Sequence, residues 1–365
     1  MNVLHFLITA ETGGIESLCR DYADHSELNN IFAVLKGVNS VNAFKMKQAG
    51  HTVVELDHHP RKLSDVWMAL VQQTKAFSID VIVVHHASPI LYLLTWGLKK
   101  KFPKIRVIAY AHSEAEDLLS GGRSTIGPMY DWILRYSFKR SDKVIAISKA
   151  VQQSLIRCFH LSEDKISIIY NGVELRSFEP RLHFAISSPI RFLYVGRLVP
   201  EKGVQNTLQA LSQLPQQFSQ DWRFDIIGDG AYRKQLEADV SSLNLTNNVR
   251  FWGAKNNIPA ILKEYDVFIH MPAYEEGFGI TVVEALASGL LCVCGSRGGI
   301  PEIITNGENG ILVRTNCELQ TVLADIIRNK EDRKYVTIRK NGIKRAEDFS
   351  IRTFSKELDA QIQLA

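Results

Sequence analysis

The stretch DVFIHMPAYEEGFGITVVEALASG, residues 266–289, is the most informative part of this chain. It begins with an apolar run of a strand's length, passes through a glycine-flanked loop, and continues as ITVVEALAS, which has helical propensity and period. A strand, a short loop and a helix form the repeating unit of parallel α/β sheets. Residues 266–289 therefore predict one such unit, with its loop at the carboxyl end of the strand.

The same unit recurs along the whole chain. The strands expected in the first half are residues 3–8, 31–35, 52–56, 81–85, 107–111, 144–147 and 166–169, and those expected in the second half are residues 190–195, 223–227, 249–252, 267–270, 291–294 and 311–313. Segments of helical period separate these runs. We therefore expect an α/β protein with two Rossmann-like domains that face each other across a cleft.

The periodicity breaks between the two halves. Residues 171–189, NGVELRSFEPRLHFAISSP, hold two prolines, three serines and no clean period, which indicates a linker. The predicted organisation is a domain at residues 1–175, a linker at 176–189, a domain at 190–350 and a C-terminal helix at 351–365 that can return to the first domain.

Composition narrows the class of protein. The 365 residues carry 43 Lys plus Arg against 39 Asp plus Glu, and a net charge of +4 is too small for a surface that attracts nucleic acid. The five cysteines form no CxxC pair, so neither a disulfide framework nor a zinc site is indicated. The N-terminal apolar run is too short for a signal peptide, and the longest apolar stretch is about half a membrane span. These features predict a cytoplasmic protein.

The loop and helix of residues 275–289 carry two carboxylates and two glycines. Glu276 lies just before the predicted helix, and Glu284 lies within its second turn. Gly277 and Gly279 leave backbone amides unshielded at the helix N-terminus, which suits an anion such as a phosphate. The carboxylates can accept hydrogen bonds from hydroxyls of a sugar or a ribose. The alternative is that Glu276 caps the helix and Glu284 is a solvated helix residue.

A second strand-loop-helix stretch, YVGRLVPEKGV at residues 194–204, carries Arg197 and Lys202. Two cations beside a glycine-containing turn can neutralise a diphosphate through charge-assisted hydrogen bonds of roughly 1.5 to 3 kcal/mol each. As an alternative, both are solvated loop cations. His112 follows the predicted strand at 107–111, at a carboxyl end where a ligand would lie, and is a candidate for a functional role.

Motifs of competing chemistries are absent from the sequence. No GxGxxG opens an N-terminal βαβ unit, and neither GxxxxGK[ST] nor GxSxG occurs, which disfavours nicotinamide-dependent, P-loop and α/β-hydrolase chemistry. No Asp-x-Asp motif occurs, so we expect no cofactor and no metal ion on a nucleotide diphosphate. The adjacent pairs His58-His59 and His85-His86 are expected to serve core or loop packing.

A basic run, WGLKKKFPKIR at residues 96–106, holds five cations and no acid: Lys99, Lys100, Lys101, Lys104 and Arg106. Such a cluster can meet anionic lipid headgroups, at about 1 kcal/mol per residue. Its alternative role is that of a solvated charged face.

Taken together, the order of these motifs resembles the retaining GT-B glycosyltransferases of family GT4. The resemblance rests on Gly-Gly at 13 and 14, His112, Asn-Gly-Val at 171–173, GRLVPEKG, GDG at 228–230, FWG at 251–253, EGFG with a second glutamate eight positions on, and GGIPE at 298–302. It covers nearly the whole chain and is most specific in the second half. Two positions depart from the family pattern: Ser17, where an arginine is common, and Leu290-Leu291, where Pro-Val is common.

The resemblance implies a role for each matching residue. Arg197 and Lys202 would bind the donor diphosphate, Glu276 would accept from a donor-sugar hydroxyl, and Glu284 would hold the ribose. The amides of Gly277, Phe278 and Gly279 would face the sugar and diphosphate, Gly14 would approach the phosphates, His112 would contact the donor sugar near the reacting carbon, and residues around Gly253 would flank the base.

The function expected from this resemblance is a retaining, metal-independent transfer of a sugar from a nucleotide diphosphate sugar, most often a UDP-sugar, to a glycan or lipid-linked acceptor. Bacterial surface polysaccharide synthesis, at the inner face of the membrane, is the expected setting. A GT-B-fold phosphorylase or epimerase, and a nucleotide-sugar-binding protein without turnover, remain as alternatives.

Overall fold

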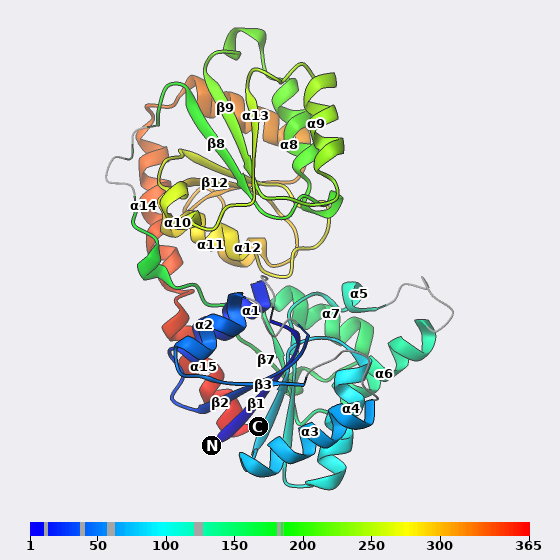
Figure 1. The fold of residues 1–365 in the computed structure, drawn as a ribbon. Coiled ribbons are helices and arrows are strands. Elements are labelled where there is room, and N and C mark those ends of the chain that lie inside the picture. Colours follow the sequence, from blue (N-terminus) through cyan, green and yellow to red (C-terminus); the bar gives the residue numbers. More distant parts are fainter. Residues whose placement is uncertain (11–13, 37–40, 57–62, 120–126, 181–183, 185) are drawn as a thin grey trace. The chain divides into compact units, whose positions relative to one another are not determined.

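The computed structural model describes residues 1–10, 14–36, 41–56, 63–119, 127–180, 184 and 186–365 (Figure 1). These residues form two compact units. Unit 1 comprises Met1–Gly172 together with Ile351–Ala365, and unit 2 comprises Val173–Ser350. The predicted linker at residues 176–189 includes residues 181–183 and 185, which lie outside the described part of the chain, as do His58 and His59.

Unit 1 is built on a seven-stranded parallel sheet with the order β3-β2-β1-β4-β5-β6-β7. Its strands are β1 (Asn2–Thr9), β2 (Asn29–Lys36), β3 (Thr52–Glu55), β4 (Val81–Val84), β5 (Arg106–Ala111), β6 (Lys143–Ala146) and β7 (Ile166–Ile168). All seven strands expected in the first half are present, and each end lies within two residues of the prediction. The central strand β4 is buried along its whole length, as is typical of a parallel sheet covered on both faces.

Nine helices of unit 1 lie within the described residues. They are α1 (Gly14–Ala23), α2 (Val41–Gln48), α3 (Leu63–Ala76), α4 (Pro89–Lys101), α5 (Ala115–Leu118), α6 (Gly127–Arg140), α7 (Lys149–Phe159), the short 3-10 helix η1 (Glu163–Lys165) and α15 (Ile351–Leu364). Local sequence sets several of their ends. Pro89 opens α4, and the Ser148 hydroxyl caps α7 by accepting a hydrogen bond from the amide of Val151 at 3.1 Å.

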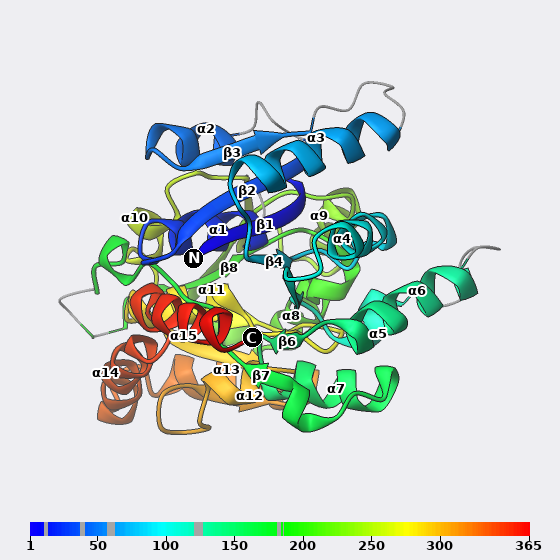
Figure 2. The same cartoon turned by 90° about the horizontal axis from the view of Figure 1, so that it is seen from below.

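The C-terminal helix α15 returns to unit 1, as the predicted fold allowed, and packs against α1 (Figure 2). Asp359 fixes it there. One carboxylate oxygen of Asp359 accepts hydrogen bonds from Tyr22 Oη at 2.5 Å and Ser26 Oγ at 2.7 Å, and the other accepts from the amide of Glu27 at 2.9 Å. Asp359 is only 8% exposed, and the three donors satisfy its carboxylate in this buried position.

Unit 2 is built on a six-stranded parallel sheet with the order β10-β9-β8-β11-β12-β13. Its strands are β8 (Ile190–Val195), β9 (Trp222–Ile227), β10 (Val249–Gly253), β11 (Val267–His270), β12 (Leu291–Gly295) and β13 (Ile311–Val313). All six strands expected in the second half are present. The two sheets confirm the predicted α/β fold with two Rossmann-like domains.

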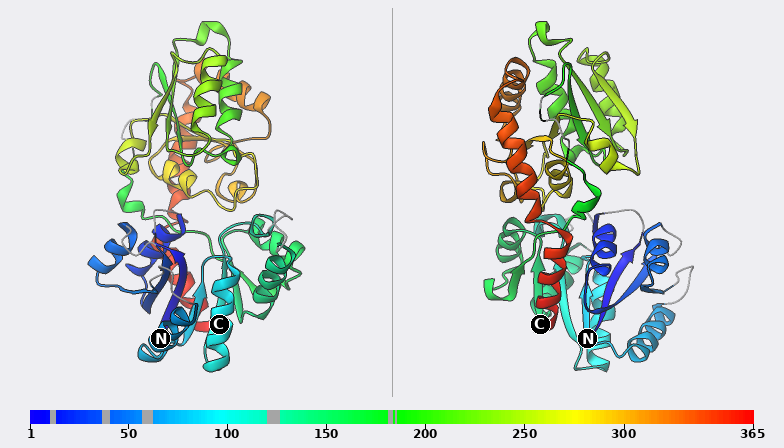
Figure 3. Two further views of the ribbon diagram at one scale, coloured as in Figure 1. Left: turned by 45° about the vertical axis from the view of Figure 1, so that its right-hand side comes forward. Right: turned by 90° about the vertical axis from the view of Figure 1, so that its left-hand side faces the viewer.

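The helices described in unit 2 are α8 (Val204–Ser212), α9 (Arg233–Ser242), α10 (Ile258–Leu262), α11 (Ile280–Ala287), α12 (Ile300–Ile303), α13 (Asn316–Arg328) and α14 (Arg333–Glu347), with 3-10 helices η2 (Leu175–Ser177), η3 (Pro200–Lys202) and η4 (Gln216–Phe218). Figure 3 follows the chain from α14, the last helix of unit 2, into α15, drawn red, which belongs to unit 1. In the described part of the chain, no helix has both the length and the apolar character that a membrane span requires.

Candidate functional site

Two loops of unit 2, at the carboxyl ends of β8 and β11, are locked together. The amide of Ala273 donates a hydrogen bond to the carbonyl of Glu201 at 2.8 Å. Gly203 lies between them at φ +69°, and a Cβ at this position would be 1.7 Å from the carbonyl oxygen of Met271. Only glycine permits both the left-handed backbone and this close approach. The result is that Lys202, the residue before Gly203, lies against the loop that carries Glu276.

Lys202 and Glu276 form a two-pronged ion pair. The Lys202 ammonium lies 2.8 Å from Oε1 and 2.7 Å from Oε2 of Glu276, and it also donates to the hydroxyl of Tyr274 at 2.9 Å. The side chains of Lys202 and Glu276 are 16% and 12% exposed, so water screens their charges only in part. The structure therefore brings together two residues that the sequence predicted separately.

His270, the last residue of β11, completes this cluster and was missed by the sequence analysis. Its Nε2 lies 3.2 Å from Oε2 of Glu276 and donates to that carboxylate. Burial opposes ionisation of Glu276, but the hydrogen bonds and charges of His270 and Lys202 outweigh it and hold the pKa of this carboxyl well below its ordinary value. Glu276 is therefore a buried carboxylate that stays ionised, which makes it a strong acceptor for hydroxyl groups. The signal for His270 was available, since it is a histidine at a strand end six positions before Glu276.

The GGIPE motif braces the loop that carries Glu276. The amide of Gly298 donates to Oε2 of Glu275 at 2.5 Å, and the amide of Gly299 donates to the carbonyl of Glu276 at 2.7 Å. Gly298 has φ +54°, and a Cβ there would be 2.2 Å from the carbonyl oxygen of Glu276. These glycines thus fix the backbone around the ionised carboxylate.

The other donor-site candidates of this stretch come after Glu276 in the chain. Gly279 precedes α11 at φ +110°, Gly277 is buried, and Phe278 is 2% exposed, with its ring edge-on to Phe349 at 5.4 Å. The first amides of an α-helix have no partner within the helix, so the start of α11 attracts an anion. Glu284 lies within α11 and is partly exposed.

Arg197 and Gly253 lie at the carboxyl ends of β8 and β10, two strands of the same sheet that β9 separates. Arg197 is exposed, and its carbonyl accepts a hydrogen bond from the hydroxyl of Tyr194 at 3.1 Å. Gly253 ends β10, where its carbonyl accepts from the amide of Gly228 at 2.9 Å. Arg197, Lys202, Glu276 and Gly253 therefore lie along one edge of the unit 2 sheet, at the carboxyl ends of its strands.

The other two candidates belong to unit 1. Gly14 begins α1, while its neighbour Gly13 lies outside the described residues. His112 directly follows β5, and its ring stacks on Tyr110 with centroids 4.2 Å apart. His112 also lines a cavity of about 230 Å³, together with other polar residues that include His86, Ser113 and Asp117. Burial, with a smaller effect of His86, lowers the pKa of His112 to about 3, so the ring is neutral at physiological pH.

Comparison with known proteins identifies the family. Residues 42–177 match the model of Glycosyltransferase Family 4, and residues 179–345 match the model of Glycosyl transferases group 1. An uncharacterized glycosyltransferase of Methanocaldococcus jannaschii is 30% identical over 278 residues, which are 74% of this chain and 72% of the relative. The chain belongs to glycosyltransferase family 4.

Further relatives of this family 4 glycosyltransferase have named activities or ligands. The UDP-Gal:alpha-D-GlcNAc-diphosphoundecaprenol alpha-1,3-galactosyltransferase of Escherichia coli is 26% identical over 230 residues, 60% of this chain and 59% of the relative. The structure of Anabaena HepE in complex with UDP-glucose superposes with a TM-score of 0.84 at 20% identity and covers 100% of both chains. The structural likeness shows that the glycosyltransferase has the GT-B fold.

The predicted basic cluster of the glycosyltransferase is only partly available to a partner. The ammonium of Lys99 pairs with Asp142, and the guanidinium of Arg106 donates to the carbonyls of Gln363 and Ala365. The cluster's other three cations, Lys100, Lys101 and Lys104, are exposed.

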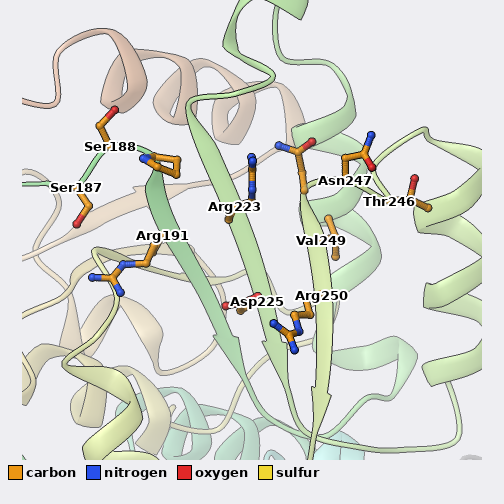
Figure 4. A pocket seen from close by; sticks show the side chains of 11 residues that line it. Ser187, Ser188, Arg191, Arg223, Asp225, Thr246, Asn247, Val249 and Arg250 are labelled. Carbon is orange, nitrogen blue, oxygen red and sulfur yellow. The ribbon is translucent and has the colours of Figure 1, made fainter.

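A second cavity lies at the opposite ends of the unit 2 strands. It has a volume of about 680 Å³ and is lined by residues near the starts of β8, β9 and β10. Figure 4 shows Arg191, Arg223 and Arg250 around it with Asp225 between them. Because Lys202 and Glu276 lie at the carboxyl ends of the strands, this cavity is separate from the candidate donor site.

Proposed function

We propose that this glycosyltransferase moves a hexose from a UDP-sugar to a glycan or lipid-linked acceptor, with retention of configuration and without a divalent metal ion. The observation that carries the proposal is the Lys202–Glu276–His270 cluster. In it, the Lys202 ammonium and the Nε2 of His270 donate to the Glu276 carboxylate and hold it in its ionised form. The cluster lies beside the N-terminus of α11 and has the chemical groups that a sugar diphosphate requires.

Each group has a distinct part in the proposed reaction. Glu276 accepts hydrogen bonds from hydroxyls of the donor sugar, and Glu284 accepts from the ribose. Arg197, Lys202 and the first amides of α11 stabilise the diphosphate as it leaves with increased negative charge. Preorganised donors of this kind are usually the largest single contribution to catalysis, because they are already oriented when charge develops. In this proposal His112 faces the donor sugar and Gly253 flanks the base.

The comparisons support the choice of donor and of setting. The Escherichia coli relative named above uses UDP-Gal and acts on a diphosphoundecaprenol-linked sugar. A second Escherichia coli relative, 27% identical over 236 residues, is named a putative colanic acid biosynthesis glycosyltransferase. We therefore favour a UDP-sugar as donor and assembly of a surface polysaccharide as the context.

The proposed independence from metal rests on the residues that replace it. A divalent ion on a nucleotide diphosphate needs carboxylate ligands, and the sequence has no Asp-x-Asp motif to supply them. Two cations, Arg197 and Lys202, supply the positive charge instead. The same phosphate oxygens are then available to assist attack of the acceptor on the face from which the leaving group departs, which gives retention.

Thermal stabilisation by a panel of UDP-, GDP- and ADP-sugars, in buffer with EDTA, tests the donor site. A donor present at 100 times its dissociation constant adds ~2.7 kcal/mol to the free energy of unfolding. We expect one UDP-sugar to stabilise the wild type and to have no effect on Lys202→Ala. Stabilisation that requires added Mg²⁺ would contradict metal independence.

The product separates the alternatives. Transfer yields UDP and a new glycosidic bond, whose anomeric configuration is read by NMR, whereas a phosphorylase yields a sugar phosphate and an epimerase yields an altered donor. A product with inverted anomeric configuration would overturn the proposed retention but not the proposed sugar transfer. A donor that binds but is never consumed with any acceptor would favour the binding protein without turnover.

We also propose that unit 1 docks on an anionic bilayer through α4 and α6, which pack against each other. Five large apolar side chains on these helices are between 41% and 63% exposed: Ile90, Leu93, Met129, Trp132 and Tyr136. Trp132 and Tyr136 stack with centroids 5.4 Å apart, and exposed cations follow them at Lys139 and Arg140. Aromatic rings flanked by cations suit the interface of a membrane with anionic headgroups.

Vesicle sedimentation tests this docking surface. We expect the protein to bind phosphatidylglycerol vesicles in a salt-sensitive way and to bind pure phosphatidylcholine vesicles weakly. Trp132→Ser should weaken binding several-fold, and Trp252→Ser, which removes a 38% exposed tryptophan from unit 2, serves as the matched control. Equal loss in both variants, or no binding by the wild type, would overturn the proposal.

A further inference from the structure

A chain of buried hydrogen bonds crosses unit 1 and ends at His112. Asn30 Oδ1 lies 2.9 Å from Nε2 of His5, Nδ1 of His5 lies 2.9 Å from Nε2 of His85, and Nδ1 of His85 lies 3.1 Å from Nε2 of His112. These residues come from β2, β1 and the loops that follow β4 and β5, so the chain follows the order β2-β1-β4-β5 of neighbouring strands in the sheet.

Proton counting gives this chain a single direction. A neutral imidazole carries one N–H, so one of its nitrogens donates and the other accepts. Asn30 Nδ2 donates to the carbonyl of Leu28 at 3.2 Å, which places the acceptor oxygen, Oδ1, toward His5. An amide oxygen can only accept, and therefore His5 donates from Nε2 and accepts at Nδ1. The same rule makes Nε2 of His85 a donor to His5, and Nε2 of His112 a donor to His85.

Burial supports the neutral form of all three rings. It lowers the pKa of His5 to about 4 against a smaller opposing effect of Asn30, and it lowers the pKa of His85 well below its ordinary value. The pKa of His112, at about 3, follows the same cause. A second proton on His5 or His85 would set two N–H donors against each other within the chain, at the cost of a buried hydrogen bond.

Neighbouring polar groups do not offer a competing direction. Cys19 Sγ lies 3.7 and 3.8 Å from the two ring nitrogens of His85, farther than the nitrogens of His5 and His112, and burial keeps its thiol protonated by raising its pKa. His86 is held separately, because its Nδ1 accepts from the amide of Ile8 at 3.3 Å and its Nε2 faces Glu16 at 3.5 Å. Asp359 acts on His5 only through its charge.

We propose that Asn30, His5 and His85 are positioning residues that hold His112 as the Nε2–H tautomer, so that its Nδ1 accepts a hydrogen bond from a substrate hydroxyl. The use of this acceptor in sugar transfer rests on the proposed function, whereas the tautomer itself follows from the hydrogen bonds. His112 lines the 230 Å³ cavity of unit 1, where a hydroxyl is the matching group. An ether, a fluorine or a carboxylate oxygen cannot donate to Nδ1, so the chain selects ligands by chemical class.

NMR of perdeuterated protein, labelled with ¹⁵N in its histidine rings, tests the tautomers directly. Correlations across the N–H···N bonds are expected from Nε2 of His112 to Nδ1 of His85, and from Nε2 of His85 to Nδ1 of His5. Asn30→Leu removes the amide oxygen that accepts from Nε2 of His5, and a second set of His112 signals should appear. Asn29→Leu, the same change at the adjacent residue of β2, should leave one set. A wild-type His112 protonated at Nδ1, or one set of signals in Asn30→Leu, would overturn the assignment.

Two substitutions of His85 test the consequence for transfer. The amide of His85→Gln can accept from His112 and donate to His5, so it preserves the direction of the chain, whereas His85→Leu interrupts it. We expect kcat to fall at least tenfold in His85→Leu and to stay within threefold of wild type in His85→Gln. The dissociation constant of UDP should change less than twofold in both, because the proposed diphosphate ligands lie in unit 2.

The outcomes separate this inference from the proposed function. Wild-type kcat in folded His85→Leu would overturn the role of the chain in transfer. Absence of transfer by the wild type with every donor and acceptor would overturn the proposed function, while the NMR correlations would still decide the tautomer of His112. If His85→Leu does not fold, Asn30→Leu provides the same comparison without altering a residue that contacts His112.

Discussion

The ammonium of Lys202 lies 2.8 Å and 2.7 Å from the two carboxylate oxygens of Glu276, although the residues are separated by 74 positions in the chain. Each side chain comes from a loop at the end of a parallel strand, and the strands β8 and β11 are neighbours in the sheet. This arrangement keeps a carboxylate ionised in a place from which water is largely excluded. The pair is therefore both a structural element and the centre of the candidate donor site.

Lys202→Met should destabilise the protein and abolish most activity. Breaking a buried ion pair by removing one partner costs roughly 3 to 5 kcal/mol, because the other charge is left uncompensated. Without this cation beside the diphosphate, transition-state stabilisation should fall by roughly 2 to 5 kcal/mol. This corresponds to a decrease in kcat/KM of about 30-fold to several thousand-fold. Urea unfolding and steady-state kinetics measure the two effects.

The double variant Lys202→Met with Glu276→Gln separates those effects. It removes both charges, so it should recover part of the stability and none of the activity. Lys263→Met is a matched control, because Lys263 forms an exposed and longer ion pair: its ammonium is 3.7 Å from Glu179, and its side chain is 42% exposed. It should cost ~1 kcal/mol or less. Equal destabilisation by Lys263→Met and Lys202→Met would show that burial of the Lys202–Glu276 pair has no energetic importance.

Stability should rise with pH between about 4 and 6.5 because of His5. The pKa of His5 is 6.5 in the unfolded chain and about 4 in the folded protein, where burial outweighs the hydrogen bond to Asn30. In this window His5 is protonated in the unfolded chain and neutral in the folded protein. Proton binding therefore favours the unfolded state most at low pH, and this effect disappears above pH 6.5. At about 1.4 kcal/mol per pKa unit, His5 should raise the free energy of unfolding by roughly 3 kcal/mol between the two ends of this window.

Denaturant unfolding at several pH values between 4 and 7.5 measures that slope. His5→Gln should reduce the slope by the share of His5, because glutamine does not titrate, while His85 and His112, whose pKa values burial also lowers, keep their own shares. His160→Asn changes an exposed histidine at the end of α7, where φ is +54°, and should leave the slope unchanged. A slope in His5→Gln as steep as that of the wild type would mean that His5 is already protonated in the folded state.

Gly203→Ala should displace the loop that carries Lys202. The new Cβ would meet the carbonyl oxygen of Met271 at 1.7 Å, and left-handed backbone adds roughly 1 to 2 kcal/mol for a residue with a Cβ. We expect a total loss of about 3 kcal/mol or more, together with loss of thermal stabilisation by the donor. Gly307→Ala isolates the backbone contribution, because Gly307 has φ +79° with nothing within 4 Å of its Cβ position. Similar melting temperatures for the two variants would contradict the role given to the close approach.

Asp359→Ala should release α15 from unit 1. The substitution leaves Tyr22 Oη, Ser26 Oγ and the amide of Glu27 without their common acceptor, at a cost of roughly 2 to 4 kcal/mol. Hydrogen exchange should become faster throughout α15 and in the neighbouring part of α1. The control is Lys356→Ala on the exposed face of the same helix. Unchanged protection of α15 in Asp359→Ala would show that apolar packing alone holds the helix.

The sequence by itself determined the alternation of strands and helices, the two parallel sheets and the loops that carry the candidate residues. This was possible because strand and helix periods, and glycines at strand ends, are local properties of the chain. The same reasoning placed Arg197, Lys202, Glu276 and His112 at carboxyl ends of strands. It could not show which of these side chains touch, because such contacts depend on the order of strands in the sheet.

Tertiary structure alone decided the electrostatic character of the site. The sequence marks Glu276 as a candidate acceptor for hydroxyl groups but does not show its ionisation. The lowered pKa of Glu276 comes from His270, which the pattern did not single out, and from Lys202. Likewise, the sequence gives no signal for His5 and Asn30 and predicts only a packing role for His85. The three become one directed hydrogen-bonded chain only when β2, β1, β4 and β5 lie side by side. The physical reason is common to both cases: charge and proton position respond to neighbours within a few ångströms and to burial, and strand order brings together residues that the linear chain keeps far apart.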